Sequence, residues 1–282
     1  MTNPTRPAND SKIKLPYFDY LLKILNDGNE AVATSFGRHV HWGYWAQPKS
    51  ATLTNADFAG AAENLSAEVC LAAKLENKLK VLDVGCGFGG TIAHINEHYA
   101  DMELVGLNID ERQLERARTT VTPLPGNAIV FQQGNACALP FPDQSFDVVL
   151  AVECIFHFPG REQFFKEAYR VLKPGGYLAL SDFVPTRLLQ PLARLKIPAW
   201  GFYGKCNIDY SVHDYRALAS QTAFTLLTER DITANTLPTY TYLRRLAVQQ
   251  RVGGKSAMLE TISVELLSRL SLLNYYIYGL QK

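Results

Sequence analysis

The run Val-Leu-Asp-Val-Gly-Cys-Gly-Phe-Gly-Gly, at residues 81–90, constrains the fold of this chain more than any other stretch. Its first four residues predict a short strand, and the glycines predict a tight turn into a helix that starts near Thr91. Because glycine has no Cβ and tolerates positive φ, such a backbone can approach a ligand closely. The N–H groups that open the next helix can also face polar ligand atoms. The run therefore predicts a strand–turn–helix unit that binds a ligand at its glycines.

Strands and helices alternate after this run, which favours parallel pairing with right-handed crossovers. Strands are expected at residues 80–84, 103–108, 128–132, 146–152, 177–182, 224–231 and 274–280. Helices are expected at residues 17–35, 54–75, 90–98, 111–120, 161–171 and 239–270. Thr54 or Asn55 would cap the second of these helices. Lys173-Pro174-Gly175-Gly176 predicts a helix stop and a turn before the fifth strand.

The composition of the chain limits the classes of partner that it can bind. The chain has 282 residues and a net charge of +1, and its basic residues are scattered, so it lacks the charge pattern of a nucleic-acid or acidic-membrane binder. No signal peptide and no bilayer-length apolar run is apparent. Five cysteines without a C-x-x-C pair predict free thiols in a reducing compartment. We therefore expect a cytoplasmic protein without a nucleic-acid or membrane partner.

The spacing of the glycines alone leaves the ligand open. Gly85-x-Gly87-x-x-Gly90 fits the pattern that binds dinucleotides. Asp83 weighs against that interpretation, because a carboxylate there suits a cationic ligand group better than a pyrophosphate. The absence of a Gly-Lys-Ser/Thr sequence after the turn disfavours phosphoryl chemistry.

The run resembles motif I of the class I S-adenosylmethionine-dependent methyltransferases, and further segments match that superfamily in order. They are the second-strand motif at 104–110, the adenine loop at 133–136 with 139–141, the fourth strand at 146–149 and the post-motif turn at 170–176. The resemblance is close over residues 79–183 and loose in the flanks. It implies S-adenosylmethionine as cofactor and an α/β fold, with a seven-stranded, mostly parallel, doubly wound sheet, an N-terminal helical lid and an inserted helical cap.

Residues 1–15 are expected to be a disordered leader because they are polar and contain Pro4 and Pro7. The resemblance implies that residues 16–282 form a single methyltransferase domain. Within it we expect N-terminal helices and lid at 16–78, a cofactor-binding core at 79–183, an inserted cap at 184–222, and C-terminal strands and helices at 223–282.

The resemblance also implies the cofactor contacts of the core. Asp83 would orient the glycine loop or meet the cofactor's ammonium group, and the loop backbone would approach its methionine and ribose at Gly85, Gly87 and Gly89. Asn135 and Ala136 would face the adenine.

The ribose position departs from the usual pattern. Asn108 stands where many members carry an acidic residue for the ribose hydroxyls, and an amide can accept one hydrogen bond while donating another. Gln113 would supply the second contact. Asp110 replaces the Ser that is usual in subfamilies acting on small natural products, and capping of the next helix competes with a ligand role.

The candidate chemistry lies where the fourth and fifth strands end, the edge at which open α/β sheets bind ligands. His157 is the best candidate for a general base, since imidazole titrates near neutral pH. Asp182 would orient that imidazole, in a pairing that resembles sugar O-methyltransferases of the rebeccamycin and erythromycin type. The alternatives are a structural His157 and an Asp182 that caps the inserted helix. Glu153 would contact the substrate or form a hydrogen bond within the core.

Two aromatic stretches flank this edge. Residues 37–45, the aromatic segment, would form a lid that brings Trp42 or Tyr44 to the cofactor's sulfonium by cation–π attraction, or a hydrophobic plug. Its His-x-His pair lacks the partners of a metal site, so no metal is expected. The apolar insert 185–211, with Trp200 and Tyr203, would build an acceptor pocket that the tract 239–270 completes. A packed helical pair or the face of a homodimer are the alternatives.

These observations predict methyl transfer to a small, fairly apolar acceptor, at a hydroxyl of a natural product. C-methylation of a prenyl or polyketide-like carbon, N-methylation, and a scaffold that binds the cofactor without catalysis are the alternatives.

Overall fold

The computed structural model describes residues 15–194, 201–204, 206–250 and 254–282. Nearly all of the expected leader, and Trp200, lie outside the described residues. Among the described residues, no helix combines the length and the apolar composition that crossing a membrane requires.

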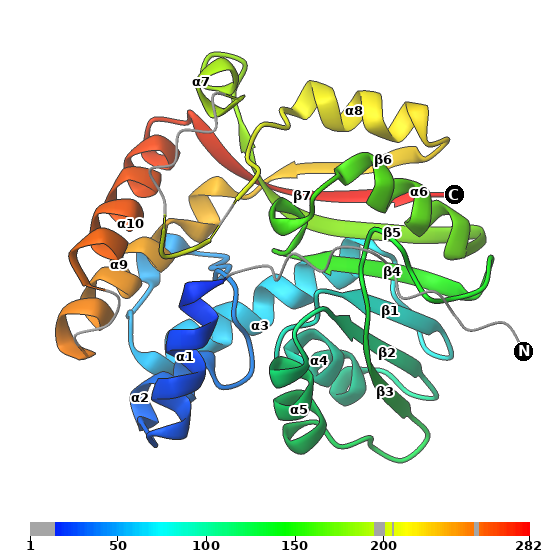
Figure 1. The fold of residues 1–282 in the computed structure, drawn as a ribbon, viewed down its shortest axis with the longest axis horizontal. Coiled ribbons are helices and arrows are strands. Elements are labelled where there is room, and N and C mark those ends of the chain that lie inside the picture. The colour runs from blue at the N-terminus through cyan, green and yellow to red at the C-terminus, as the bar shows by residue number, and fades with distance from the viewer. Residues whose placement is uncertain (1–14, 195–200, 205, 251–253) are drawn as a thin grey trace, which may run out of the picture.

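One seven-stranded sheet forms the centre of the molecule, with the order β3-β2-β1-β4-β5-β7-β6 (Figure 1). The strands β1 to β5 pair in parallel, and β7 runs antiparallel to both of its neighbours. This confirms the expected seven-stranded, mostly parallel sheet. The strands are β1 (Lys80–Val84), β2 (Glu103–Asn108), β3 (Ala128–Gln133), β4 (Phe146–Val152), β5 (Leu172–Pro185), β6 (Thr225–Asp231) and β7 (Leu273–Gln281).

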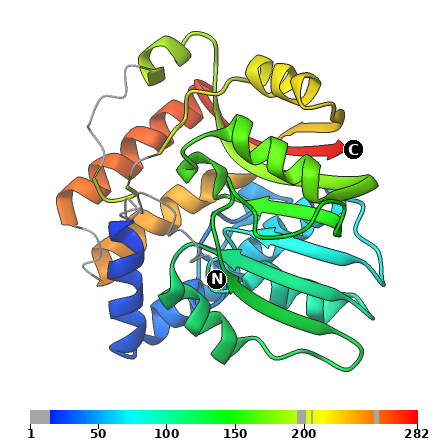
Figure 2. The ribbon, with the colours of Figure 1, turned by 45° about the vertical axis from the view of Figure 1, so that its right-hand side comes forward.

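Helices cover both faces of the sheet, so the sheet is doubly wound (Figure 2). The helices α3 (Asn55–Ala72), α4 (Gly90–His98) and α5 (Glu111–Thr120) share one buried cluster with the strands, and α6 (Arg161–Val171) and α8 (Val212–Gln221) share the other. Both faces of β1 are therefore buried, which explains why its sequence is almost continuously apolar.

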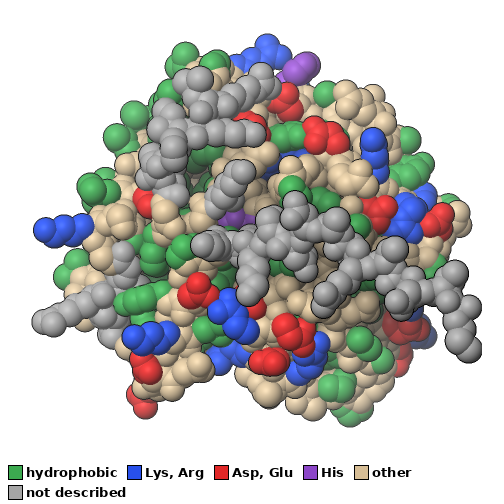
Figure 3. Space-filling view, in the orientation of Figure 1, with side chains coloured by type: hydrophobic (Ala, Val, Ile, Leu, Met, Phe, Trp, Pro, Cys, Tyr) green, Lys and Arg blue, Asp and Glu red, His purple; other side chains and the backbone are tan. Residues whose placement is uncertain are grey.

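The remaining helices lie at one end of the sheet. Figure 1 shows α1 (Pro16–Asn26), α9 (Thr233–Gln250) and α10 (Gly254–Arg269) gathered there, with α2 (Glu30–Phe36) below them. The short elements are α7 (Gln190–Arg194) and the 3-10 turns η1 (Pro48–Ser50) and η2 (Ile155–His157). On the face seen in Figure 3, acidic and basic side chains are interspersed.

Local capping explains why several helix bounds were predictable. The Thr54 side chain accepts a hydrogen bond from the Asp57 amide at the start of α3. Asp110 does the same for the Arg112 amide at the start of α5, as the capping interpretation requires. These side chains satisfy amides that have no partner within the helix.

Other bounds differ from expectation for identifiable reasons. The helix expected at 17–35 divides into α1 and α2, because Gly28 has φ of +78° and Asn29 caps the second helix. The expected fifth strand is longer, since residues 173–176 form a bulge: Phe146 pairs with Leu172, whereas Val148 pairs with Tyr177. The tract 239–270 holds two helices, and the first begins at Thr233 although Pro238 lies inside it.

Candidate functional site

A cavity opens at the carboxyl ends of β1, β2 and β4, and we call it the strand-edge cavity. It holds about 730 Å³ of empty space, part of which is open to solvent. Its wall contains many of the residues that the sequence suggested: Asp83, Gly85, Gly87, Asn108, Gln113, Glu153 and His157.

The glycine loop after β1 owes its shape to backbone that other residues rarely adopt. Gly85, Gly87 and Gly89 have φ of +71°, +55° and +80°. A Cβ at Gly85 would lie 2.7 Å from that of Cys154, whereas one at Gly87 would have its nearest neighbour, the Gln113 Oε1, at 4.0 Å. A Cβ at Gly89 would lie 2.9 Å from the Phe131 ring, so Gly89 packs behind the loop instead of lining the cavity. Two of the three glycines thus bring backbone to the cavity.

Asp83, near the end of β1, is 2 % exposed, and its Oδ2 has no hydrogen-bond partner among the described residues. Burial raises the pKa of this carboxyl to about 8. A buried acceptor without a partner is costly, and a cationic donor in the cavity would satisfy it and favour the ionised form. The orphaned oxygen therefore fits an ammonium group, as the sequence resemblance implied.

Asn108 and Gln113 form the expected amide pair. The Asn108 Nδ2 donates to the Gln113 Oε1 over 2.9 Å, and both side chains are buried in the wall. The Asn108 Oδ1 accepts from the Ile109 amide at 2.7 Å, which fixes the orientation of the side chain. The Asn108 Nδ2 and the Gln113 Nε2 retain N–H groups for a hydroxylated ligand.

The two residues expected at the adenine follow β3. Ala136 packs in the buried cluster with Val84 and Leu107, and the Asn135 Oδ1 accepts from the Cys137 amide at 2.8 Å. Neither belongs to the described wall of the cavity. Their contact with the adenine stays a prediction.

The aromatic segment reaches the cavity with residues other than those expected. Arg38, His39 and His41 line the wall. The Trp42 ring lies instead against Phe183, Tyr240 and Tyr203, and the Tyr44 ring lies near Arg230. The histidines had been considered only as metal ligands, and His-x-His was the available signal for them. In the described part of the chain, no group of three or more His, Cys, Asp or Glu side chains is arranged so that it could hold a metal ion.

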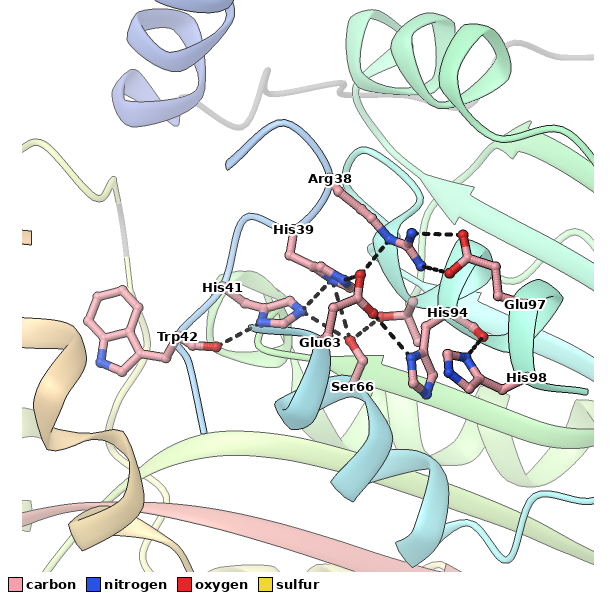
Figure 4. Close-up of polar contacts among 10 residues, drawn as sticks. Arg38, His39, His41, Trp42, Glu63, Ser66, His94, Glu97 and His98 are labelled. Carbon is pink, nitrogen blue, oxygen red and sulfur yellow. Dashed lines mark hydrogen bonds and ion pairs between the residues drawn. The ribbon is translucent and has the colours of Figure 1, made fainter. Parts of the chain in front are cut away.

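A buried polar network fixes this segment against α3 and α4, as Figure 4 shows. The His41 Nδ1 donates to the Trp42 carbonyl at 2.9 Å, so its Nε2 faces His39 and Ser66 as an acceptor when the ring is neutral. The His39 Nε2 lies 2.8 Å from the Glu63 Oε1, and the Glu63 Oε2 is 3.1 Å from the His94 Nδ1. The network ties the cavity wall to two helices.

The charges of this network follow from burial and contact. Burial, with His39 adding to the effect, lowers the pKa of His41 to about 3. Burial also lowers the pKa of His39, although Glu63 opposes the shift. Burial alone would raise the pKa of Glu63, but contacts with His39, His94 and Arg38 place it well below its usual value. Near neutral pH, the network therefore holds a neutral His41 and an ionised Glu63.

His157 ends η2, directly after β4, and lines the strand-edge cavity. Its Nε2 lies 3.4 Å from the hydroxyl of Tyr17, which comes from α1 and also lines the cavity. Burial raises the pKa of Tyr17 well above its ordinary value, so the phenol stays protonated. Tyr17 was missed by the sequence analysis, where it was one aromatic residue in an apolar helix.

Glu153 faces the same cavity from an unusual backbone position, with φ of +50°. Its Oε2 accepts hydrogen bonds from the Trp42 amide and the Tyr275 hydroxyl. Burial raises the pKa of Glu153 to about 8 in spite of these donors. This carboxyl is thus bonded within the fold and borders the cavity, and its contact with a substrate stays a prediction.

Asp182 is fully buried, and its partners differ from the expected one. Its Oδ2 accepts from the Arg161 Nη2 at 2.6 Å and from the Tyr215 hydroxyl, and its Oδ1 accepts from the Phe183 amide. These bonds have a physical reason: Arg161 is also fully buried at the start of α6, and a buried guanidinium requires a carboxylate beside it. The expected pairing of Asp182 with His157 stays a prediction.

A second space, the helical cavity, lies between α1, α2, α9, α10 and residues 202–203, and holds about 720 Å³ of empty space that is partly open to solvent. Tyr203, expected at the substrate, lines it and hydrogen-bonds Thr261 at 2.9 Å. Tyr17 and Val40 line both cavities.

The chain is similar in sequence to known methyltransferases. Residues 82–180 match the family described as "Methyltransferase domain". The chain is 31% identical to Methyltransferase GfsG of Streptomyces halstedii over 215 residues, which cover 76% of each protein. It is 31% identical to the 27-O-demethylrifamycin SV methyltransferase of Amycolatopsis mediterranei over 211 residues, 73% of this chain and 74% of that protein.

Among solved structures, the geranyl diphosphate C-methyltransferase of Streptomyces coelicolor, in complex with Mg²⁺, geranyl diphosphate and S-adenosyl-L-homocysteine, superposes with a TM-score of 0.70. It covers 98% of this chain and 99% of that one at 15% identity, so the likeness concerns the fold.

Proposed function

This chain belongs to the class I S-adenosylmethionine-dependent methyltransferases, and on that premise we propose that it methylates a hydroxyl of a small, largely apolar molecule, with His157 as general base. One observation supports the proposal above all others. His157 lines the same cavity as Asp83 and the glycine loop, so a base and the residues suited to the cofactor face one space.

The residues of the strand-edge cavity suit the parts of the cofactor. Asp83 would hold its ammonium group, the Asn108–Gln113 pair its ribose, and the backbone at Gly85 and Gly87 the segment between them. S-adenosylmethionine supplies a methyl group on a sulfonium, and an oxygen nucleophile in line with that bond takes it.

The role of His157 is to accept a proton at its Nε2. The acceptor oxygen gains a methyl group and loses its hydrogen to this nitrogen, while the donor leaves as a neutral thioether. The Tyr17 hydroxyl now lies 3.4 Å from the Nε2, where a hydroxyl of the acceptor would have to come. Access to the base therefore requires Tyr17 to move or to share the nitrogen.

The name of one relative, the 27-O-demethylrifamycin SV methyltransferase, also indicates methylation of an oxygen. Glu153 favours a second candidate, methylation of carbon. Its carboxyl borders the same cavity, and when ionised it would stabilise positive charge that develops on a carbon skeleton. The two candidates need different residues.

The test is turnover of His157→Ala with a panel of hydroxylated acceptors and labelled methyl donor. Loss of a positioned base lowers kcat by roughly 10²–10⁴-fold, while the affinity for S-adenosylmethionine stays within a few-fold of wild type. His213→Ala, an exposed histidine on α8, is the matched control and keeps full activity. Near-normal turnover of His157→Ala, together with loss of turnover in Glu153→Gln, would replace the oxygen acceptor with a carbon acceptor.

A further inference from the structure

The helical cavity has a chemistry of its own. Its wall is almost entirely carbon, contributed by α1 through Leu21 and Ile24, by α9 through Leu243, and by α10 through Met258. Such a wall favours burial of apolar surface and gives little to a polar ligand.

Charge is nearly absent from this wall. Arg244 is its one basic residue among the described residues, and its Nε lies 3.2 Å from the Glu265 Oε2. A carboxylate or phosphate in the cavity would lose its water and find only a guanidinium that already has a partner. The wall therefore selects against anions.

The cavity adjoins the site of the reaction. Tyr17 lines both cavities, and while its hydroxyl lies near the His157 Nε2, its ring lies 6.0 Å from that of Tyr203 in the helical cavity. Tyr203 is in turn held by its hydrogen bond to Thr261 on α10. One aromatic side chain thus stands between the apolar wall and the base.

The geometry points to the helical cavity as the binding site for the body of the methyl acceptor, a neutral and mainly apolar molecule whose hydroxyl reaches His157 past Tyr17. This inference rests on the proposed function for the identity of its ligand, and it narrows the acceptor to uncharged molecules. Tyr17 is then a residue that determines which hydroxyls reach the base.

Displacement of a neutral fluorescent probe, N-phenyl-1-naphthylamine, tests the site without turnover. We expect the full-length protein to bind the probe, and 1-decanol to displace it at least tenfold more effectively than decanoate, which has the same chain length and a charge. Equal or better displacement by decanoate would overturn the inference.

Matched variants locate the probe. Ala247 lines the helical cavity, and Ala247→Phe should weaken probe binding at least tenfold; Val248→Phe, which adds a ring on the exposed side of the same helix, should leave it unchanged. Should Ala247→Phe fail to fold, Leu243→Gln places a polar group in the same wall and should weaken probe binding several-fold. Wild-type probe affinity in a folded variant of this wall contradicts the inference.

His157→Ala separates this inference from the proposed function. It should bind the probe as wild type does while losing turnover. Full turnover in His157→Ala, with probe binding still sensitive to Ala247→Phe, would refute the base and leave the site standing. Turnover that depends on His157 but is indifferent to Ala247→Phe would support the base and refute the site.

Discussion

The strand-edge cavity and the helical cavity are nearly equal in volume but are built in opposite ways. The first is bounded by strand ends, left-handed glycines and a polar network in which His39, His41 and Glu63 contact one another. The second is bounded mainly by the apolar sides of four helices, α1, α2, α9 and α10. A polar network has few satisfactory geometries, whereas an apolar wall tolerates changes that keep its volume. The strand-edge cavity therefore depends on the directions of its hydrogen bonds, whereas the helical cavity depends on its volume.

The largest expected effect concerns Asp83, where direction matters most. Asp83→Asn should weaken S-adenosylmethionine binding by roughly 10- to 100-fold, because a hydrogen bond to a charged group contributes about 1.5–3 kcal/mol. Calorimetric titration measures it, with exposed Asp101→Asn as the control. Probe binding in the helical cavity should not change. A cofactor affinity within twofold of wild type would show that the orphaned oxygen does not meet the ammonium group.

The next effect is the pH dependence of stability that the polar network creates. The folded state keeps His41 neutral down to about pH 3, whereas the unfolded chain protonates it below its ordinary pKa of 6.5. The unfolded state then binds more protons, so His41 costs about 1.4 kcal/mol of stability per pH unit as pH falls through this window. Glu63, whose pKa is lowered, acts in the same direction at lower pH.

Denaturant unfolding at pH 6.5 and pH 5 measures this slope. His41→Asn should reduce the loss of unfolding free energy over that interval by about 2 kcal/mol. The exposed His213→Asn should leave the wild-type slope. A His41→Asn variant with the wild-type slope would mean that the buried imidazole is protonated in the folded state.

A smaller effect is expected where volume is what matters. Met258→Ala removes part of the apolar wall of the helical cavity and should weaken binding of a neutral alcohol by about fivefold, since each buried methylene contributes about 0.8 kcal/mol and the gap partly closes. Leu259→Ala, an exposed neighbour on α10, is the control. Probe displacement measures both, and a change in cofactor affinity of similar size would contradict the division between the cavities.

The smallest effect belongs to the residue that both cavities share. Tyr17→Phe keeps the ring and removes the hydroxyl that lies 3.4 Å from the His157 Nε2. A contact of that length is weak, so kcat/KM for a hydroxyl acceptor should rise by about two- to threefold as the competing hydroxyl disappears. Steady-state kinetics measures it, and a fall of more than tenfold would make the phenol part of the reaction.

The sequence predicts the features of the fold that depend on local signals. The order of strands and helices, and bounds such as those of α4 and α5, follow from local signals: glycines, caps and apolar periodicity. Asp83 and Asn108 were found because each belongs to a strand end that a short motif marks. Each of these signals is contained within a few consecutive residues, and it predicts contacts between residues that are close in the sequence.

The remainder depends on which distant faces meet. Arg161 was predicted only as the start of a helix, and its pairing with Asp182 follows from the packing of α6 on β5. The aromatic segment was recognised, yet its histidines face the strand-edge cavity while Trp42 packs on Phe183. The sequence predicts helices in these regions, but not that the faces of α1, α2, α9 and α10 would leave a cavity between them.

The position of Tyr17 has a thermodynamic consequence. Moving the Tyr17 side chain costs free energy. A ligand in one cavity that displaces it lowers this cost for a ligand that binds in the other cavity. The two binding equilibria are then coupled, and the coupling is reciprocal: whatever factor the methyl donor contributes to acceptor affinity, the acceptor returns to the donor. A single phenol between the cavities would thus make the enzyme bind its two ligands cooperatively.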